Sequence, residues 1–97
     1  MIVAMARITL LIPDNHSLKG KRKVVRSLVE KVRHRFEAAI AEVDDHDLWQ
    51  KSGIGVALVG NDSQLLQRRL DQIMHFMEEQ HLAQIIDSQV ELCYLEP

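Results

Sequence analysis

Lysines and arginines are concentrated in one stretch of the chain, at a density that suits the binding of phosphate groups. Between Ser17 and Arg35 the sequence contains eight of these cations and a single acid, Glu30, so the segment has a net charge of +7. The whole chain has a net charge of −2, which leaves −9 for the other residues. Because lysine and arginine neutralise phosphates and release their counterions, this segregation of charge predicts that the segment docks on the backbone of RNA.

We expect the phosphate contacts to come from cations that share one side of this segment. The predicted RNA-binding residues are Lys19, Lys21, Arg22, Lys23, Arg26 and Arg33. A domain that reads RNA sequence carries aromatic side chains on its central strands, and the apolar run Ile54–Gly60 has none. Binding is therefore expected to follow the backbone or the shape of structured RNA, such as ribosomal RNA in the ribosome, with no readout of a DNA sequence.

The basic segment is also compatible with two roles that do not involve RNA. It could be a solvated helix face that is balanced by nearby acids, such as those of Asp44 to Asp47. It could also bind an acidic protein, in which case the chain would be a protein-interaction module. RNA docking would weaken steeply with salt, whereas binding to a protein would survive treatment with a nuclease.

A second cluster places side chains of metal-ligand type close together before the single tryptophan. Its members are Glu42, Asp44, Asp45, His46 and Asp47. Oxygen ligands of this kind can hold Mg²⁺ or Ca²⁺, but the spacing of an EF-hand and the glycine at its bend are absent. We favour turn chemistry, in which aspartates accept hydrogen bonds from turn amides, and we predict no metal and no cofactor. Trp49 is expected to pack on the core, as large aromatic side chains usually do.

No pattern of catalytic residues stands out. The only cysteine, Cys93, falls in a strand-like segment, where a buried structural thiol is expected. The five histidines have no metal-binding spacing, and the chain contains neither a phosphate loop nor a dinucleotide-binding glycine pattern. Because no nucleophile–base pair is visible, we predict a protein that is not an enzyme.

Two helices are predicted from periodicity and caps. The basic segment is apolar at intervals of three and four over Leu18–Phe36, and Ser17 is in position to cap its first turn. The apolar residues of this stripe are Leu18, Val25, Leu28, Val29, Val32 and Phe36. A second helix is expected after Asn61 and Asp62, with Gln64 in the capping-box position relative to Asn61. Its stripe consists of Leu66, Leu70, Ile73 and Met77.

Four segments have the pattern of strands. Residues Ile2–Ile12 alternate between two faces with a period of two. Glu37–Val43 and Ile85–Leu95 are also predicted as strands, whereas Ile54–Gly60 is apolar almost throughout and suits a strand buried on both faces. The order β-α-β-β-α-β predicts an α+β, ferredoxin-like split fold, with a four-stranded antiparallel sheet and two helices on one face. Residues 1–97 are expected to form this single domain, with the first and third strands in the centre.

The face of the sheet away from the helices is expected to expose apolar side chains. These are Val3, Met5, Leu11, Ala57 and Val59. A patch of this kind argues for a partner, so we predict a homodimer with these residues in its interface. A dimer that binds a small ligand on this face is a further alternative to RNA docking.

The chain lacks the features of a protein that enters or crosses a membrane. No apolar run approaches the length of about 20 residues that spans a bilayer. Met1–Ala6 is apolar but precedes the first basic residue, Arg7, which is the reverse of the order in a signal peptide. We therefore expect a cytoplasmic protein.

Two segments resemble a known family. Residues 17–28, SLKGKRKVVRSL, resemble the S-L-K-x-K-R-x-V-[VL]-[RK]-S-L segment of the YlxP-like family, small bacterial proteins of unknown function. Residues 41–51, AEVDDHDLWQK, are similar to that family's A-E-V-x-x-x-D-x-W-[QK]-[KR] segment. Residues 54–62 look like its apolar third strand and the helix cap that follows. The resemblance covers nearly the whole chain and implies a ferredoxin-like fold.

The resemblance implies a function only by association, and the chain departs from the family at one residue. In some bacteria, genes of the family lie beside genes for translation initiation and ribosome maturation, which implies a ribosomal role. Many relatives have glutamate where this chain has Gly20, and glutamate there would form a capping box with Ser17. The glycine removes that box and weakens the first turn of the helix by up to about 1 kcal/mol.

Overall fold

β1 (Ile2–Leu11) runs through the middle of a four-stranded antiparallel sheet, between β3 (Lys51–Gly60) and β4 (Gln84–Tyr94). β2 (Ala39–Asp44) pairs with the other edge of β3, so the order across the sheet is β2-β3-β1-β4. This computed structural model describes residues 1–97. It confirms the prediction that the first and third strands form the central pair.

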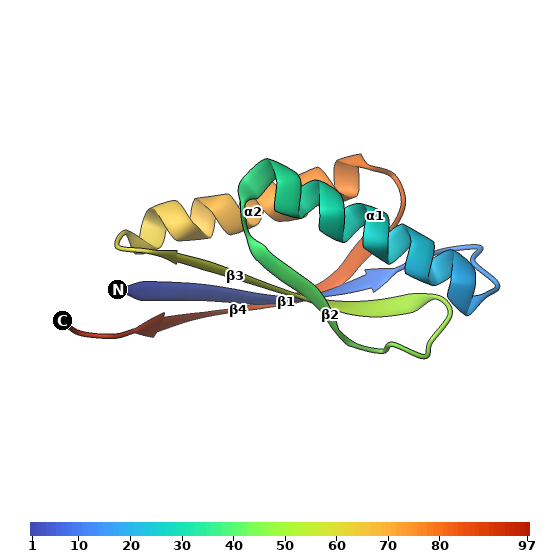
Figure 1. The fold of residues 1–97 in the computed structure, drawn as a ribbon, viewed down its shortest axis with the longest axis horizontal. Helices are drawn as coiled ribbons and strands as arrows, with labels where there is room; N and C mark the ends of the chain where they lie inside the picture. Colours follow the sequence, from blue (N-terminus) through green and yellow to red (C-terminus); the bar gives the residue numbers. More distant parts are fainter.

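Both helices, α1 (Leu18–Phe36) and α2 (Ser63–Glu79), lie on one face of the sheet and leave the other face bare (Figure 1). Along the chain the order is β1-α1-β2-β3-α2-β4. This arrangement confirms the predicted α+β, ferredoxin-like fold. Neither helix is long and apolar enough to cross a membrane.

The core lies between the sheet and the two helices. Alternation along β1 buries every second residue from Ile2 to Leu10, because successive side chains of a strand point to opposite faces. The helices meet this layer with the stripes predicted from their periodicity. Their buried apolar residues are Val25, Leu28 and Val32 of α1 and Leu66, Leu70, Ile73 and Met77 of α2. This packing sets the rotation of α1 about its axis, and so decides which of its side chains reach solvent.

Each helix begins at a side-chain cap. Ser17 Oγ accepts a hydrogen bond from the backbone N–H of Gly20 at 3.0 Å, as expected for an N-cap. Asp62 Oδ1 accepts from the N–H groups of Gln64 and Leu65 at 3.0 and 3.2 Å. The capping box expected between Asn61 and Gln64 does not form, because Asp62 is the cap and Gln64 follows it by only two residues.

Two strands begin two or three residues away from their predicted starts, and β4 begins one residue early, at Gln84. β2 begins at Ala39 and not at Glu37, because Glu37 ends α1 with a left-handed backbone, φ 52°. β3 begins at Lys51 and not at Ile54, because Lys51 still pairs with Leu11 at the end of β1. The antiparallel ladder between the two central strands therefore extends over the whole length of β1.

A bulge in β4 changes the face that one apolar residue occupies. The register of β1 against β4 shifts between Thr9, which pairs with Asp87, and Leu10, which pairs with Ile85. Ile86 has no partner in β1; it is exposed and lines a hollow with Thr9 and Asp87. A bulge inserts one extra residue into a strand, so the alternation of side chains along β4 is interrupted at Ile86.

The bare side of the sheet, called the open face below, carries the apolar residues predicted for it. Val3 lies opposite Val59, and Met5 lies opposite Ala57, on the two central strands. Val59 is 63% exposed, and Val3, Met5, Leu11 and Ala57 are half-buried. The structure confirms where these five residues lie, and their role as an interface remains a prediction.

Candidate nucleic-acid interface

The side chains of α1 divide into a buried stripe and an exposed basic side. The stripe packs on the sheet and on α2, and the other side of the helix faces solvent. Its exposed cations, called the basic face below, are Lys19, Arg22, Lys23, Arg26, Lys31, Arg33 and Arg35. With Glu30, the one exposed acid of α1, these seven residues give the exposed side of the helix a net charge of +6.

Lys21 is the exception among the predicted RNA-binding residues, because its side chain is 0% exposed. Its Nζ lies 3.1 Å from Oε2 of Glu42 in β2 and also donates a hydrogen bond to the carbonyl oxygen of Asp45. Ser52 Oγ donates to the same oxygen of Glu42 at 2.6 Å. A cation enclosed in this way cannot reach a phosphate at the surface, so the prediction is wrong for Lys21.

The helical position of Lys21 explains its burial. It precedes Val25 by four residues and Leu28 by seven, and these intervals place all three side chains on one stripe. A charge on the core side is stable only with a partner, and Glu42 provides one from the neighbouring strand. The spacing of Lys21 from Val25 and Leu28 therefore indicates its burial from the sequence alone. The same spacing does not identify Glu42 as its partner.

None of the basic-face cations forms an ion pair. The three ion pairs of the structure join Arg7 to Asp44, Lys21 to Glu42, and His75 to Glu79. The acids of residues 44–47, considered above as counter-charges for α1, therefore pair with none of its exposed cations. This finding removes support from the alternative of a basic helix face balanced by neighbouring acids.

At the C-terminal end of α1, arginines are held in defined positions. Arg33 Nη2 donates to the carbonyl oxygen of Ile40 at 2.9 Å, so this guanidinium is only partly available to a ligand. The guanidinium of Arg35 lies 5.1 Å from the ring centroid of Phe76 in α2, within the range of a cation–π contact. Arg69 of α2 donates to the last carbonyl of α1 at 2.9 Å and adds a cation at the negative end of the helix dipole.

A hollow of about 750 Å³ lies on the basic face where α1 passes Phe76 of α2. The α1 residues that line it are Lys23, Arg26, Ser27, Glu30, Lys31, His34 and Arg35. A phosphate in this hollow would meet cations from successive helical turns. Lys31 and Arg35 are not among the residues predicted from the sequence, because the sequence does not place α2 beside them.

The start of α1 is anchored to the connection between β2 and β3. Asn15 Nδ2 donates to the carbonyl oxygens of Ser17 and Trp49, and Gln50 Nε2 donates to the carbonyl oxygen of Asn15 at 3.0 Å. Gly20 lies against this junction, because a Cβ at Gly20 would collide with Oδ1 of Asn15. The residue that departs from the family pattern therefore permits a close approach of the Asn15 side chain.

Two side chains that were predicted to be buried are exposed. Trp49 is 53% exposed, because the rest of the protein contacts the backbone of this connection while the indole ring projects into solvent. Cys93 lies on β4 opposite Val3 and faces the open face, which no helix covers. Burial of Trp49 and Cys93 would require another element to pack over them, and the fold places no helix or strand over either side chain.

The acidic and histidine side chains of residues 42–47 do not converge on a common point. Glu42 and Asp44 pair with two different cations. No group of three potential metal ligands forms anywhere in the structure. The chain then makes a turn, in which the N–H of Leu48 donates to the carbonyl oxygen of Asp45 at 3.1 Å.

Comparison with known proteins confirms the resemblance seen in the sequence. An uncharacterized protein, YlxP of Bacillus subtilis (strain 168), is 27% identical over 77 residues, which are 79% of this chain and 84% of that protein. Protein YJCS has a TM-score of 0.60 at 10% identity and covers 92% of this chain and 96% of its own. MupZ from Pseudomonas fluorescens has a TM-score of 0.57 at 21% identity, and the match covers 91% of this chain and 69% of MupZ. These two structural likenesses show the fold alone. Residues 3–90 match the family described as "Protein of unknown function (DUF503)", and the chain therefore belongs to that family.

Proposed function

We propose that this protein is a non-enzymatic, cytoplasmic RNA-binding protein that docks on structured RNA, such as that of the ribosome, through the basic face of α1. The observation that carries the proposal is that seven exposed cations share one helix and none has a carboxylate partner. Unpaired cations are free to replace the counterions of phosphates, and the release of those counterions drives binding.

The start of α1 supports the same function. The first turn contains no acid, although acids there would stabilise the helix by about 0.3–1 kcal/mol each. Lys19, Arg22 and Lys23 occupy the first turns instead, at the positive end of the helix dipole, where cations are disfavoured. Selection for stability alone would not place them there, whereas a phosphate-binding surface requires them.

The shape of the surface suits an extended RNA backbone. α1 has 19 residues and is therefore about 28 Å long at a rise of 1.5 Å per residue. Its cations can contact several phosphates in succession, and the exposed side of the helix carries no aromatic side chain that would read a base. We therefore expect affinity that depends on RNA shape and on salt, with little dependence on sequence.

The test compares two charge-matched variants in binding to ribosomal RNA and to small ribosomal subunits over a salt gradient. Arg22→Glu/Lys23→Glu reverses one arginine and one lysine of the basic face. The control, Gln64→Glu/Gln67→Glu/Arg68→Glu, changes the total charge equally at exposed positions of α2, away from both the basic face and the open face. The new acids of the first variant lie near the positive end of α1, so this variant is expected to fold at least as stably as the wild type.

RNA docking predicts that the logarithm of the affinity falls linearly with the logarithm of salt concentration. The α1 variant should lose at least about tenfold in affinity, with a salt slope reduced by about two, while the control keeps most of its affinity. No binding of the wild type at low salt, where attraction is strongest, would overturn the proposal. A different outcome is that the wild type captures an acidic protein after nuclease treatment. If only the α1 variant failed to capture that protein, the helix would be assigned to a protein partner.

A further inference from the structure

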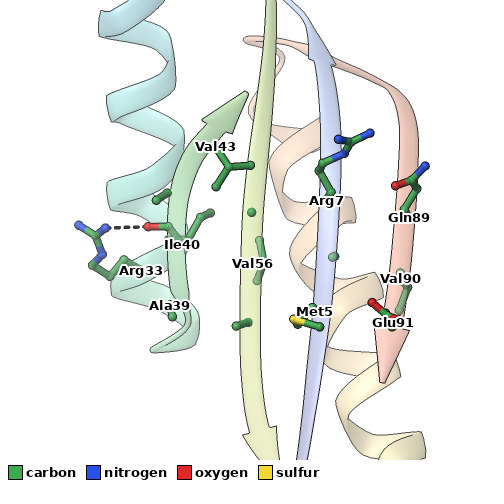
Figure 2. Close-up of a pocket in the computed structure, with 14 residues that line it drawn as sticks. Met5, Arg7, Arg33, Ala39, Ile40, Val43, Val56, Gln89, Val90 and Glu91 are labelled. Carbon is green, nitrogen blue, oxygen red and sulfur yellow. Dashed lines mark hydrogen bonds between the residues drawn. The ribbon is translucent and has the colours of Figure 1, made fainter. Parts of the chain in front are cut away.

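The open face presents an apolar groove that no part of the chain covers. The groove has a volume of about 910 Å³ and is lined by residues of all four strands (Figure 2). Small residues form much of its floor: Ala39, Ala41, Gly55 and Ala57. Larger side chains stand beside them, with Val43 from β2 on one side and Met5 from β1 on the other. A Cβ on Gly55 would lie 2.9 Å from Cγ1 of Val43, so this valine already occupies the space above the glycine.

The apolar surface extends beyond this groove. Val3, Leu11 and Val59 belong to the open face but do not line the groove. Val3 and Leu11 are separated along β1 by about 27 Å, at 3.3–3.4 Å per residue. A small ligand in the groove would leave these side chains in water, whereas a second sheet would cover the whole face.

The size of the open face is that of a protein–protein interface. Three strands of ten or eleven residues and one of six, spaced by about 4.8 Å and rising about 3.3 Å per residue, give a flat area of about 600 Å². Protruding side chains raise the accessible area above this value. A specific interface of standard size buries about 800 Å² on each partner, so one sheet packed on another would reach the size that a stable dimer needs.

We propose that two copies of this chain form a homodimer by packing their open faces together, around a twofold axis that runs parallel to the strands. The charges of β4 select this axis, because Asp87 and Glu91 flank Gln89 on the open face. An axis across the strands would lay β4 on β4 and set Asp87 against Glu91 of the second copy. The parallel axis lays β4 over β2, where Ala39 and Ala41 carry no charge.

The same axis brings two acids of the open face, one from each copy, close to one cation. Asp87, Thr9, Gly53 and Asp44 lie in one row across the four strands. Placing β4 over β2 therefore brings Asp87 of one copy close to Asp44 of the other. The Arg7 Nη1 that lies 3.0 Å from Asp44 Oδ2 is half-exposed, and in the dimer it can contact a carboxylate from each copy.

Dimerisation through the open face leaves all of each basic face free except Arg33, which also lines the groove. The helices cover the opposite side of each sheet (Figure 1), so both copies of α1 lie on the outside of the dimer. One consequence rests on the proposed function: the dimer presents two RNA-binding surfaces and gains avidity for RNA that can reach both. The dimer itself requires only the open face.

The experiment measures the mass of the intact chain by light scattering and sedimentation over a wide range of concentrations. Val59→Glu places a charge on the open face, and Leu65→Glu places the same charge on the exposed side of α2. Both residues are large exposed apolar side chains, so neither substitution disturbs the core. The wild type and Leu65→Glu should reach twice the chain mass of 11.2 kDa, and Val59→Glu should weaken the dimer at least tenfold.

Arg7→Gln provides an independent check, because it removes the cation that pairs with Asp44 and should also weaken the dimer. A wild type of single-chain mass at every concentration would overturn the proposal, and so would a dimer that Val59→Glu leaves intact. A monomer that binds an apolar fluorescent probe, and loses it in Ala57→Glu on the floor of the groove, would assign the face to a small ligand instead. The α1 variant Arg22→Glu/Lys23→Glu should remain dimeric, so a failure of RNA binding is distinguishable from a failure of the dimer.

Discussion

Nζ of Lys21 and Oε2 of Glu42 lie 3.1 Å apart inside the protein and join the first half of α1 to β2. The lysine side chain is fully buried, and that of Glu42 is 16% exposed. Removing both charges of a buried pair can cost little, whereas removing one leaves the other buried without a partner. The pair therefore couples the packing of α1 to the hairpin formed by β2 and β3.

Lys21→Met should lower the free energy of unfolding by about 3–5 kcal/mol, because it retains the length of the side chain but leaves the Glu42 carboxylate without its cation. Unfolding in urea, followed by circular dichroism, measures this change. In the double variant Lys21→Met/Glu42→Gln the uncompensated charge is absent, and Ser52 still has an acceptor. The double variant should therefore be more stable than Lys21→Met, and the opposite order would contradict the buried pair.

Lys21→Met should also leave RNA binding unchanged under conditions in which the variant is folded, because Lys21 does not belong to the basic face. Arg22→Gln, one residue along the helix, should reduce the salt slope of RNA binding by about one. Filter binding at several salt concentrations compares the two. Equal losses in both variants would mean that Lys21 contacts RNA after all and that its pairing with Glu42 opens on binding.

Trp49→Ala should cost less than about 1 kcal/mol of stability, since the indole ring is largely exposed and little apolar contact is lost. Phe76→Ala should cost about 2–3 kcal/mol, because its ring packs edge-on against Phe36 with centroids 5.5 Å apart. Urea unfolding of both variants tests the contrast. Trp49 is the only tryptophan, so efficient acrylamide quenching of the native fluorescence gives a second measure of its exposure.

Asp62→Ala should lower stability by about 1 kcal/mol, because its carboxylate accepts two backbone N–H groups at the start of α2. Asn61→Ala removes a similar side chain one residue earlier and should change stability by less than about 0.5 kcal/mol. Thermal unfolding of the two variants provides the comparison. A larger loss in Asn61→Ala would show that α2 begins one residue earlier in solution.

Much of the fold follows from local patterns in the chain. The bounds of α1 agree with the predicted Leu18–Phe36 because its apolar period and the cap at Ser17 are both local. The alternation of β1 likewise identified which of its residues face the core. Periods and caps act over a few residues, so a single sequence reports them well.

The candidate site was only partly predictable, because exposure depends on segments far apart in the chain. Lys21 was counted among the RNA-binding cations, yet β2 places Glu42 beside it and encloses it. Lys31 and Arg35 line a hollow together with Phe76 of α2, which lies more than forty residues further along the chain. Trp49 and Cys93 are exposed because no layer covers the hairpin connection or the open face.

The sequence by itself determined the order of helices and strands, the family, and the concentration of positive charge in one segment, since these depend on residue types and short spacings. Only the tertiary structure decided which of those charges are free. It paired Lys21 with Glu42 and left the other seven cations of α1 without acidic partners. The physical reason is that burial and ion pairing arise between residues brought together by folding, and their partners are not encoded in any local pattern.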